Sequence, residues 1–574
     1  MGAIFGFSGW SGKKNRAMAA ALSHRGIPPA RTHASIRSTA CWLPSRSHHG
    51  GIIEHCGQVI ALAGRLFTDK KETRMAKLLR SYRDQGLDFV RNLHGAYVLA
   101  VLDEDRIHLA RDPAGIRTIY YGFYNDRFIF AVEPKGVLAW SGFARNLRPA
   151  AVAQYFSFGF IPGRETMLEN LWELPPGHTV TFANGRVEPP RCFFSVEEEE
   201  KEEKDEQAWM DEFVHIHEQA VRDQLPESGS VGLFFSGGPG SGIVSAEVIR
   251  QCGKKLPSWS IRVGDPPGNP HGQSRSVADL AEHIGSDHRE ISVQPKEFLA
   301  RVQDVIHALN EPVADPSAVF EYMLSAAAAG EVEYVVNGAG ASPVFGGADN
   351  IPILLRHWYG GIKQGRFFRE RTYLSSCFGA YDELNNLLTP EWRSLYNSHE
   401  ALEGILTPFF EAERPENFLD KLSAVNIRLR GGNMILPKTE RMTGVHGLNS
   451  LSPLFDDRLI RLSFRMPSTL KLRQGTDKII LRQAYKNILP QEFADRQDSG
   501  LQLFRQSDFR RALRSYVRRF LGRREIKQAG IFNPDRVREL LNLPPEQTLP
   551  RHEQILWMLV TFEIWRRTVL REKT

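Results

Sequence analysis

The residues best suited to chemistry in this chain lie in one glycine-rich stretch, residues 231–246. Apolar residues typical of a strand lead into a turn that contains Ser236, Gly237, Gly238 and Ser241, and small residues typical of a helix follow. Glycines let a backbone turn sharply with its N–H groups pointing inward, and a helix that begins there adds its positive end. The pattern is typical of a cradle that holds phosphate groups. An ordinary strand-to-helix connection without a ligand is the alternative.

The segments around this turn predict the sheet that has to position it. From Trp209 onward, apolar residues recur first at helical spacing and then in alternating strand-like and helix-like segments. We expect helices over residues 245–252 and 276–284, and strands over residues 258–263, 289–292 and 333–336. Such alternation predicts a parallel sheet covered by helices, with ligands at the carboxyl ends of its strands.

A layered β domain is expected before this sheet, because residues 1–196 are rich in strand-like segments. The predicted strands are residues 58–66, 96–103, 118–124 and 127–132. Residues 197–206 contain eight acids and two lysines, which cannot form a core, so we expect a solvated acidic linker there. Residues 207–574 then form the second domain.

The composition excludes several classes of protein. The 574 residues are 42% apolar and 24% charged, with a net charge of +6, as expected of a soluble globular chain. No apolar run approaches the length of a membrane span. The five cysteines form no C-x-x-C pair, which argues against a zinc site and a disulfide framework. We therefore expect a cytoplasmic protein that does not bind membranes.

The turn at residues 236–241 resembles the pyrophosphate-binding loop of the asparagine synthetase family, which is written Ser-Gly-Gly-x-Asp-Ser. Similar family landmarks are found at residues 23–26, 111–117, 133–138, 158–163, 174–178, 337–347 and 477–482. The resemblance implies an α+β N-terminal-nucleophile (glutaminase-like) layered β domain of the glutamine amidotransferase type 2, followed by an α/β adenine-nucleotide α-hydrolase-like (PP-loop) synthetase domain. It also implies an ATP-dependent carbon–nitrogen ligase of amino-acid biosynthesis.

The glutaminase site of that family is altered in this chain. The family nucleophile is a cysteine exposed by removal of Met1, and Gly2 stands in its place. The family's Asn-Gly-Glu substrate loop reads Ala63-Gly64-Arg65, which removes the amide that helps to hold the oxyanion and reverses one charge. We therefore predict that glutaminase activity is absent.

The synthetase site has lost the family's acidic residues. Gly240 and Ser342 stand where aspartates hold Mg²⁺, and Ala339 stands where the family has a catalytic acid. None of the three offers a carboxylate to a hard cation, so we predict no metal ligand and do not expect Mg²⁺. Lys478 matches a family lysine that stabilises charge on the reacting phosphate. It is the one catalytic side chain that we predict, and a plain surface lysine is the alternative.

Weak nucleotide binding is expected to persist. In the family, backbone groups at strand ends hold adenine and ribose, and the glycine-rich cradle holds the phosphates. The resemblance therefore implies these cofactor-binding residues: Phe234, Ser236, Gly237, Gly238, Ser241, Val263, Asn337 and Gly338. Because the cradle is kept without its metal ligands, we predict weak binding of ATP.

Three functions are compatible with these residues. The first is a catalytically impaired homologue that serves as a scaffold or regulator. The second is an ATP-dependent ligase that forms amide bonds with an amine not taken from glutamine, in the manner of β-lactam synthetases and lasso-peptide cyclases. The third is an ordinary glutamine-hydrolysing asparagine synthetase. Loss of both the nucleophile and the metal-binding acids favours the first, since β-lactam-type relatives keep the metal-binding acids.

A basic helix near residue 515 is a candidate surface for binding a partner. Its apolar stripe is surrounded by arginines and consists of Phe509, Leu513, Val517 and Phe520. Such a helix can bind nucleic acid or an acidic partner, but an arginine-rich face is more often solvated or paired with acids of its own chain, such as those of residues 197–206, and the sequence leaves these alternatives open. The expected partners are a nucleotide and, as candidates, an active paralogue, another protein or a second copy of this chain. Nucleic acid is not expected.

Overall fold

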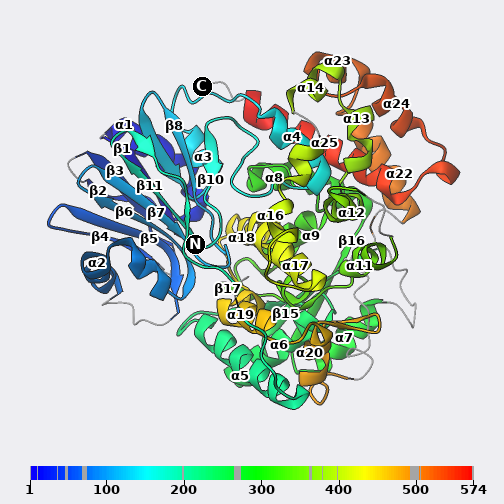
Figure 1. The fold of residues 1–574 in the computed structure, drawn as a ribbon, viewed down its shortest axis with the longest axis horizontal. Coiled ribbons are helices and arrows are strands. Elements are labelled where there is room, and N and C mark those ends of the chain that lie inside the picture. Colours follow the sequence, from blue (N-terminus) through cyan, green and yellow to red (C-terminus); the bar gives the residue numbers. More distant parts are fainter. Residues whose placement is uncertain are drawn as a thin grey trace.

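A computed structural model describes residues 2–9, 11–34, 37–45, 50–67, 74–196, 199–263, 273–360, 365–377, 379–396, 399–490, 503 and 506–571. A β-rich N-terminal domain lies beside a larger domain that holds a second kind of sheet and most of the helices (Figure 1). The predicted fold class, a layered β domain followed by an α/β domain, is confirmed.

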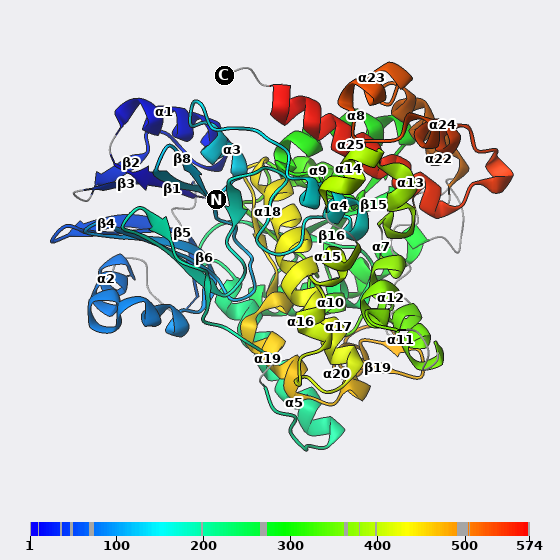
Figure 2. The same ribbon diagram turned by 45° about the horizontal axis from the view of Figure 1, so that its top comes forward.

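Two antiparallel sheets are stacked in the N-terminal domain (Figure 2). The first has the order β10-β8-β9-β1-β3-β2, with β1 Ala3–Ser8, β2 Arg31–Ala34, β3 Ser38–Leu43, β8 Tyr120–Tyr124, β9 Arg127–Ala131 and β10 Leu171–Glu173. The second has the order β12-β11-β7-β6-β5-β4, with β4 Gly51–His55, β5 Gln58–Leu66, β6 Gly95–Asp103, β7 Arg106–Arg111, β11 His178–Ala183 and β12 Arg186–Val187. Apolar side chains from both sheets, such as Phe5 and Ala61, belong to one buried core.

The larger domain is built on a five-stranded parallel sheet. Its order is β16-β15-β14-β17-β18, with β14 Val231–Phe234, β15 Pro257–Val263, β16 Asp287–Val293, β17 Tyr334–Val336 and β18 Asn449–Leu451. The strands expected over residues 258–263, 289–292 and 333–336 are therefore present. Helix α6 runs over Pro239–Cys252 and so begins six residues before the expected helix 245–252. Proline is well suited to the first position of a helix, where no N–H is needed, so α6 starts inside the glycine-rich turn.

The acidic linker is fixed to the larger domain. Its described carboxylates pair with four arginines, and the pairs are Glu199–Arg461, Glu200–Arg414, Glu202–Arg465 and Glu206–Arg473. Glu206 is also the first residue of α5, Glu206–Gln224. Each partly exposed pair contributes little on its own, but four of them from one short segment hold it along the domain. The expected solvated linker is thus an attached strap over its described residues.

The basic helix near the C-terminus is a packed element. It is α22, Ser507–Arg518, and its residues Phe509, Leu513 and Val517 are buried. Arg514 donates to Glu553 Oε1 at 2.9 Å in α25, Pro550–Arg571. Pairing with acids of the same chain is therefore found, with Glu553 as one partner. Among the described helices, α25 included, none is long and apolar enough to cross a membrane.

Candidate functional site

The expected nucleophile position holds Gly2, directly before β1. Glycine has no side chain that can attack an amide. The nearby cysteines are poor substitutes. Cys41 is buried in β3, where burial raises the pKa of its thiol to about 11, so it is almost wholly protonated near neutral pH. Cys56 is exposed at the turn between β4 and β5.

Arg65, at the position of the family's substrate-binding glutamate, makes a contact between the two domains. Its Nη1 and Nη2 donate to the carbonyl oxygens of Gln224 and Leu225, at 2.7 and 2.8 Å. These carbonyls end α5, where the last C=O groups have no partner within the helix and carry its negative pole. Arg65 therefore supplies hydrogen-bond donors to the C-terminal carbonyl groups of α5 in the larger domain.

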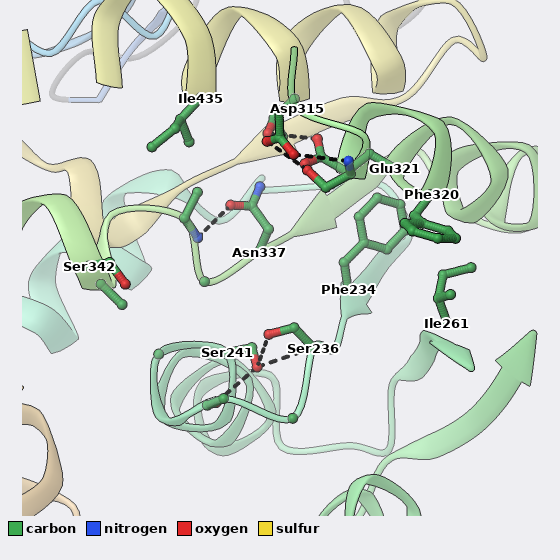
Figure 3. Close-up of a pocket in the computed structure, with 18 of the residues that line it drawn as sticks. Phe234, Ser236, Ser241, Ile261, Asp315, Phe320, Glu321, Asn337, Ser342 and Ile435 are labelled. Carbon is green, nitrogen blue, oxygen red and sulfur yellow. Dashed lines mark hydrogen bonds between the residues drawn. The ribbon is translucent and has the colours of Figure 1, made fainter. Parts of the chain in front are cut away.

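A cavity of about 700 Å³ opens at the carboxyl ends of β14, β15 and β17 (Figure 3). All eight predicted cofactor-binding residues line it, and they are Phe234, Ser236, Gly237, Gly238, Ser241, Val263, Asn337 and Gly338. The positions of the lost acids, Gly240, Ala339 and Ser342, line the same cavity. The parallel sheet thus brings these distant residues together, as its topology predicts.

The glycine-rich cradle is held by two serines. Ser241 Oγ donates to Gly238 O at 3.0 Å and lies 3.0 Å from Ser236 Oγ. Gly237 adopts a φ of 74°, a conformation that favours glycine. Ser241 lies in the first turn of α6, whose N-terminal N–H groups suit an anion. Pro239, at the first position of that helix, has no N–H to donate, so the cradle has one donor fewer than another residue would give.

Gly240 lies against the loop that follows β17. A Cβ atom added to Gly240 would come within 2.4 Å of Ala341 Cβ and 3.3 Å of Gly338 O. Contacts under 3.0 Å do not occur for real Cβ atoms, so one of the two segments would have to move for any side chain here. The two segments that carry metal-binding aspartates in the resembling family therefore lie in direct contact with each other.

The cavity contains carboxylates elsewhere, and each is bound to a cation. Among the described lining residues these pairs are Asp315–Lys438 and Glu321–Lys438 at 2.7 and 2.8 Å, Glu290–Arg262 at 2.9 Å and Asp349–Arg430 at 3.0 Å. Four carboxylates thus face three cations, so the described lining carries no excess of positive charge.

Comparison with known proteins agrees with this architecture. The family profile described as asparagine synthase matches residues 214–567. The chain belongs to the asparagine synthase family. A second profile, described as a glutamine amidotransferase domain, matches residues 62–193. The N-terminal domain is therefore of the amidotransferase kind that family members carry.

Individual relatives are distant. The chain is 23% identical over 539 residues to asparagine synthetase [glutamine-hydrolyzing] 1 of Bacillus subtilis, covering 88% of this chain and 82% of that protein. It is 24% identical to a putative asparagine synthetase of Mycobacterium bovis, covering 74% of this chain and 69% of the relative. A solved structure of the allosteric regulatory enzyme of purine biosynthesis is 12% identical, covers 50% of this chain and 80% of its own, and reaches a TM-score of only 0.26.

Lys438 is a cavity residue that motif reading missed. It lies in α18, Leu436–Gly444, and its Nζ contacts Asp315 Oδ2 at 2.7 Å, Ser317 Oγ at 2.6 Å and Glu321 Oε1 at 2.8 Å. Burial alone would lower the pKa of Lys438, but Asp315 and Glu321 outweigh burial and raise it. The lysine is therefore charged. The available signal was its position three residues before Arg441-Met442, a dipeptide that also resembles a landmark of the asparagine synthetase family.

Lys478, the predicted catalytic lysine, lies outside the lining of this cavity. It is fully buried, and its Nζ donates to Asp477 Oδ2 at 2.6 Å. Arg482 donates to the other oxygen of the same carboxylate at 2.6 Å. Lys478 is therefore not the exposed surface lysine that was the alternative. Its catalytic role stays a prediction, and that role would require its ammonium group to leave Asp477.

His94 links the amidotransferase domain to the synthetase domain. It precedes β6, and its Nδ1 lies 2.6 Å from Asp457 Oδ1 while its Nε2 lies 3.4 Å from Asp456 Oδ2. The two aspartates stand at the start of α19, Asp457–Arg465. Burial alone would lower the pKa of His94, but hydrogen bonds and charge from both aspartates outweigh burial and raise it to about 10. The imidazolium form therefore joins the domains near neutral pH.

Replacing His94 should give a pH-dependent loss of stability. Because the pKa of His94 is raised by folding, its contribution is complete below about pH 6.5, the pKa of a free histidine. The contribution falls as the pH rises and is lost near pH 10. We expect His94→Gln to lower the free energy of unfolding by about 1–3 kcal/mol at pH 6. Urea unfolding of both proteins at pH 6, 8 and 10 measures the difference, and a constant difference would contradict the prediction.

Proposed function

We propose that this member of the asparagine synthase family binds a nucleotide but neither hydrolyses glutamine nor activates a carboxylate with ATP and Mg²⁺. In this proposal it is a cytoplasmic scaffold or regulatory protein, and its partner is an active paralogue, another protein or a second copy of the chain. The observation that carries the proposal is the contact between Gly240 and Ala341. The Cβ atom of an aspartate at residue 240 would lie 2.4 Å from Ala341 Cβ, so the metal-binding carboxylate could be placed there only if one of the two segments moved.

The residues of the cavity do not fit Mg²⁺. This ion prefers octahedral oxygen coordination that includes one or two carboxylates. Gly240, Ala339 and Ser342 supply no carboxylate, and the four lining carboxylates are already bound to Lys438, Arg262 and Arg430. A metal clamp stabilises the departing pyrophosphate by several kcal/mol, and its loss supports an impaired synthetase.

Weak nucleotide binding is supported by what the cavity keeps. The strand ends and the cradle present backbone groups and the hydroxyls of Ser236 and Ser241. ATP without a bound metal carries about four negative charges, and the described lining has more carboxylates than cations. Repulsion therefore disfavours the triphosphate. We propose that AMP binds at least as tightly as ATP.

Titration with labelled ATP and AMP, with and without Mg²⁺, tests the proposal. The affinity for ATP should change less than about tenfold when Mg²⁺ is added, because the ion lowers the charge of ATP in solution but finds no carboxylate ligand at residues 240, 339 and 342. Pyrophosphate exchange should be undetectable with aspartate or other carboxylates. Robust Mg²⁺-dependent exchange would overturn the impaired-synthetase proposal.

A negative charge introduced into the glycine-rich cradle tests whether the cradle is the phosphate site. Ser236→Asp should weaken AMP binding at least tenfold, because a carboxylate would face the phosphate. Adenosine has no phosphate, and its binding should be unchanged. Ser228→Asp is the matched control, since Ser228 is exposed before the opposite end of β14 and does not line the cavity. Equal loss in both variants would show that the cradle is not the phosphate site.

A second candidate is the amide-forming ligase that uses an amine other than glutamine-derived ammonia. Lys438 favours it, because a buried cation is kept beside the cavity where the family forms its acyl-adenylate. Amine-dependent release of pyrophosphate in the exchange assay would support this candidate over the scaffold. Lys438→Met should then abolish that release.

A further inference from the structure

The aromatic and basic face of helix α11 has no role in the nucleotide site. Helix α11, Asn350–Tyr359, packs on the core through the buried residues Ile353 and Leu354. On another face of the same helix, Leu355 is 46% exposed, Trp358 65% and Tyr359 83%. Residues three and four apart lie on one helix face, so these three side chains form a single apolar stripe. They are among the few large apolar side chains that the described surface exposes.

A groove runs along this stripe. Helix α12, Phe368–Ser376, lies next to α11 in both views (Figures 1 and 2) and forms the other wall. The groove has a volume of about 700 Å³, and it is lined by Leu355, Arg356, Tyr359, Gly360, Phe368, Arg371, Thr372 and Ser375. Apolar side chains on facing helices with exposed aromatics at the rim are typical of a groove that takes one peptide segment.

The exposed charges on the two helices that form the groove are positive, and the exposed Asp382 lies beside the groove, where it accepts a hydrogen bond from Ser375 at 2.8 Å. Among the described residues of α11, α12 and the turn before α12, the exposed ionic side chains are Arg356, Arg366, Arg369 and Arg371. Arg356 donates to Ser376 Oγ and Arg369 to a backbone carbonyl, so neither of these contacts neutralises its charge, whereas Arg371 is paired with the buried carboxylate of Glu403 at 2.9 Å. Glu370, the acidic residue of this segment, is buried.

We propose that the groove between α11 and α12 is a docking site for an acidic peptide segment that carries apolar side chains. Tryptophan, tyrosine and arginine are the residues that dominate binding at protein interfaces, and the stripe and the groove lining together contain all three. The arginines match carboxylates in both charge and planar geometry. The apolar walls Leu355 and Phe368 match apolar side chains rather than a phosphate backbone, which favours a peptide over single-stranded nucleic acid.

The helix that forms one wall of the groove also borders the proposed nucleotide cavity at its other end. Asp349 and Asn350, at the start of α11, line that cavity, and Tyr359 is nine residues further along the helix. At 1.5 Å per residue the two ends of α11 are about 14 Å apart, which four or five residues of an extended peptide span. A docked segment therefore lies within reach of the cavity, although docking itself does not depend on nucleotide binding.

Binding of a synthetic acidic, aromatic polypeptide tests the proposal. The probe is fluorescein-labelled poly(Glu,Tyr), followed by anisotropy with the full chain at low salt, with poly(Lys) and polyuridylate as comparison polymers. We expect poly(Glu,Tyr) to bind more tightly than either. The double variant Trp358→Ser/Tyr359→Ser should weaken its binding at least tenfold, and so should Arg356→Glu.

The matched control is Leu395→Ser, because Leu395 is 56% exposed at the end of α14, Pro390–Leu395. It should bind like the unchanged protein, and thermal melts of all variants should coincide because every altered side chain is exposed. Equal binding by the double variant would overturn the proposal. Tighter binding of polyuridylate that is lost in the double variant would assign the surface to nucleic acid instead. A dimer in sedimentation that only the double variant dissociates would assign it to a second copy of this chain.

Discussion

Purified protein should release no more ammonia from glutamine than a blank, and Gly2→Cys should not restore the reaction. The variant gains a thiol, but Ala63 still lacks the amide that stabilises the oxyanion, and loss of one such donor costs about 10²–10³ in rate. Arg65 adds a second obstacle, because its positive charge would repel the ammonium group of glutamine. Its guanidinium group is held in place by the carbonyl oxygens of Gln224 and Leu225. Ammonia measured with coupled glutamate dehydrogenase checks both proteins.

Two further measurements make this result decisive. The double variant Gly2→Cys/Ala63→Asn restores the nucleophile and the amide but keeps the positive charge of Arg65. We therefore expect its turnover to stay below detection as well. Turnover by the unchanged protein that a thiol alkylator abolishes would mean that Cys41, Cys56 or another cysteine has replaced the nucleophile. Turnover by Gly2→Cys alone would show that the remaining site is competent.

Arg111→Ala should lower the free energy of unfolding by about 3–5 kcal/mol, the usual cost of removing one partner of a buried ion pair. Arg111 is fully buried at the end of β7, and Nη1 donates to Glu173 Oε1 and Leu174 O, both at 2.7 Å. Nη2 donates to Gly432 O of the synthetase domain at 2.7 Å. The alanine variant leaves Glu173, which is 3% exposed, as a buried charge without its cation.

Calorimetry of three variants tests this role. Arg111→Lys keeps the charge but not the fork of donors, so it should fall between the alanine variant and the unchanged protein. Arg106→Ala, at an exposed position of the same strand, is the control and should melt within about 1 °C of the unchanged protein. The hypothesis would be rejected if Arg111→Ala and Arg106→Ala melted together.

The cavity at the carboxyl ends of the parallel strands could be predicted from sequence because its residues follow strands. Phe234, Val263 and Asn337 each come at or just after the end of a parallel strand, and parallel strands present their carboxyl ends at one edge. The start of α6 was less predictable, because Pro239 reads equally as a turn residue and as the first residue of a helix. The predicted helix is therefore present as α6, but its predicted start was six residues too late.

Side-chain partners could not be predicted, because they depend on contacts between distant segments. Lys438 comes from a helix more than 100 residues after Asp315, and nothing in its local sequence indicates their pairing. Lys478 fits its motif, yet its ammonium group is bound to the adjacent Asp477. His94 looks like a turn histidine in the sequence, and only the packing of the two domains places it beside Asp456 and Asp457.

The contact of Arg65 with the end of α5 bears on how this chain could change over evolutionary time. A side chain at a substrate position now satisfies Gln224 and Leu225, two carbonyls of the other domain. Glutamate at residue 65 would set a negative charge against the negative pole of α5, so this change would be selected against on grounds of folding. Deleting the amidotransferase domain would leave the same carbonyls bare. A domain whose own reaction is proposed to be absent therefore still stabilises its neighbour, which favours its retention.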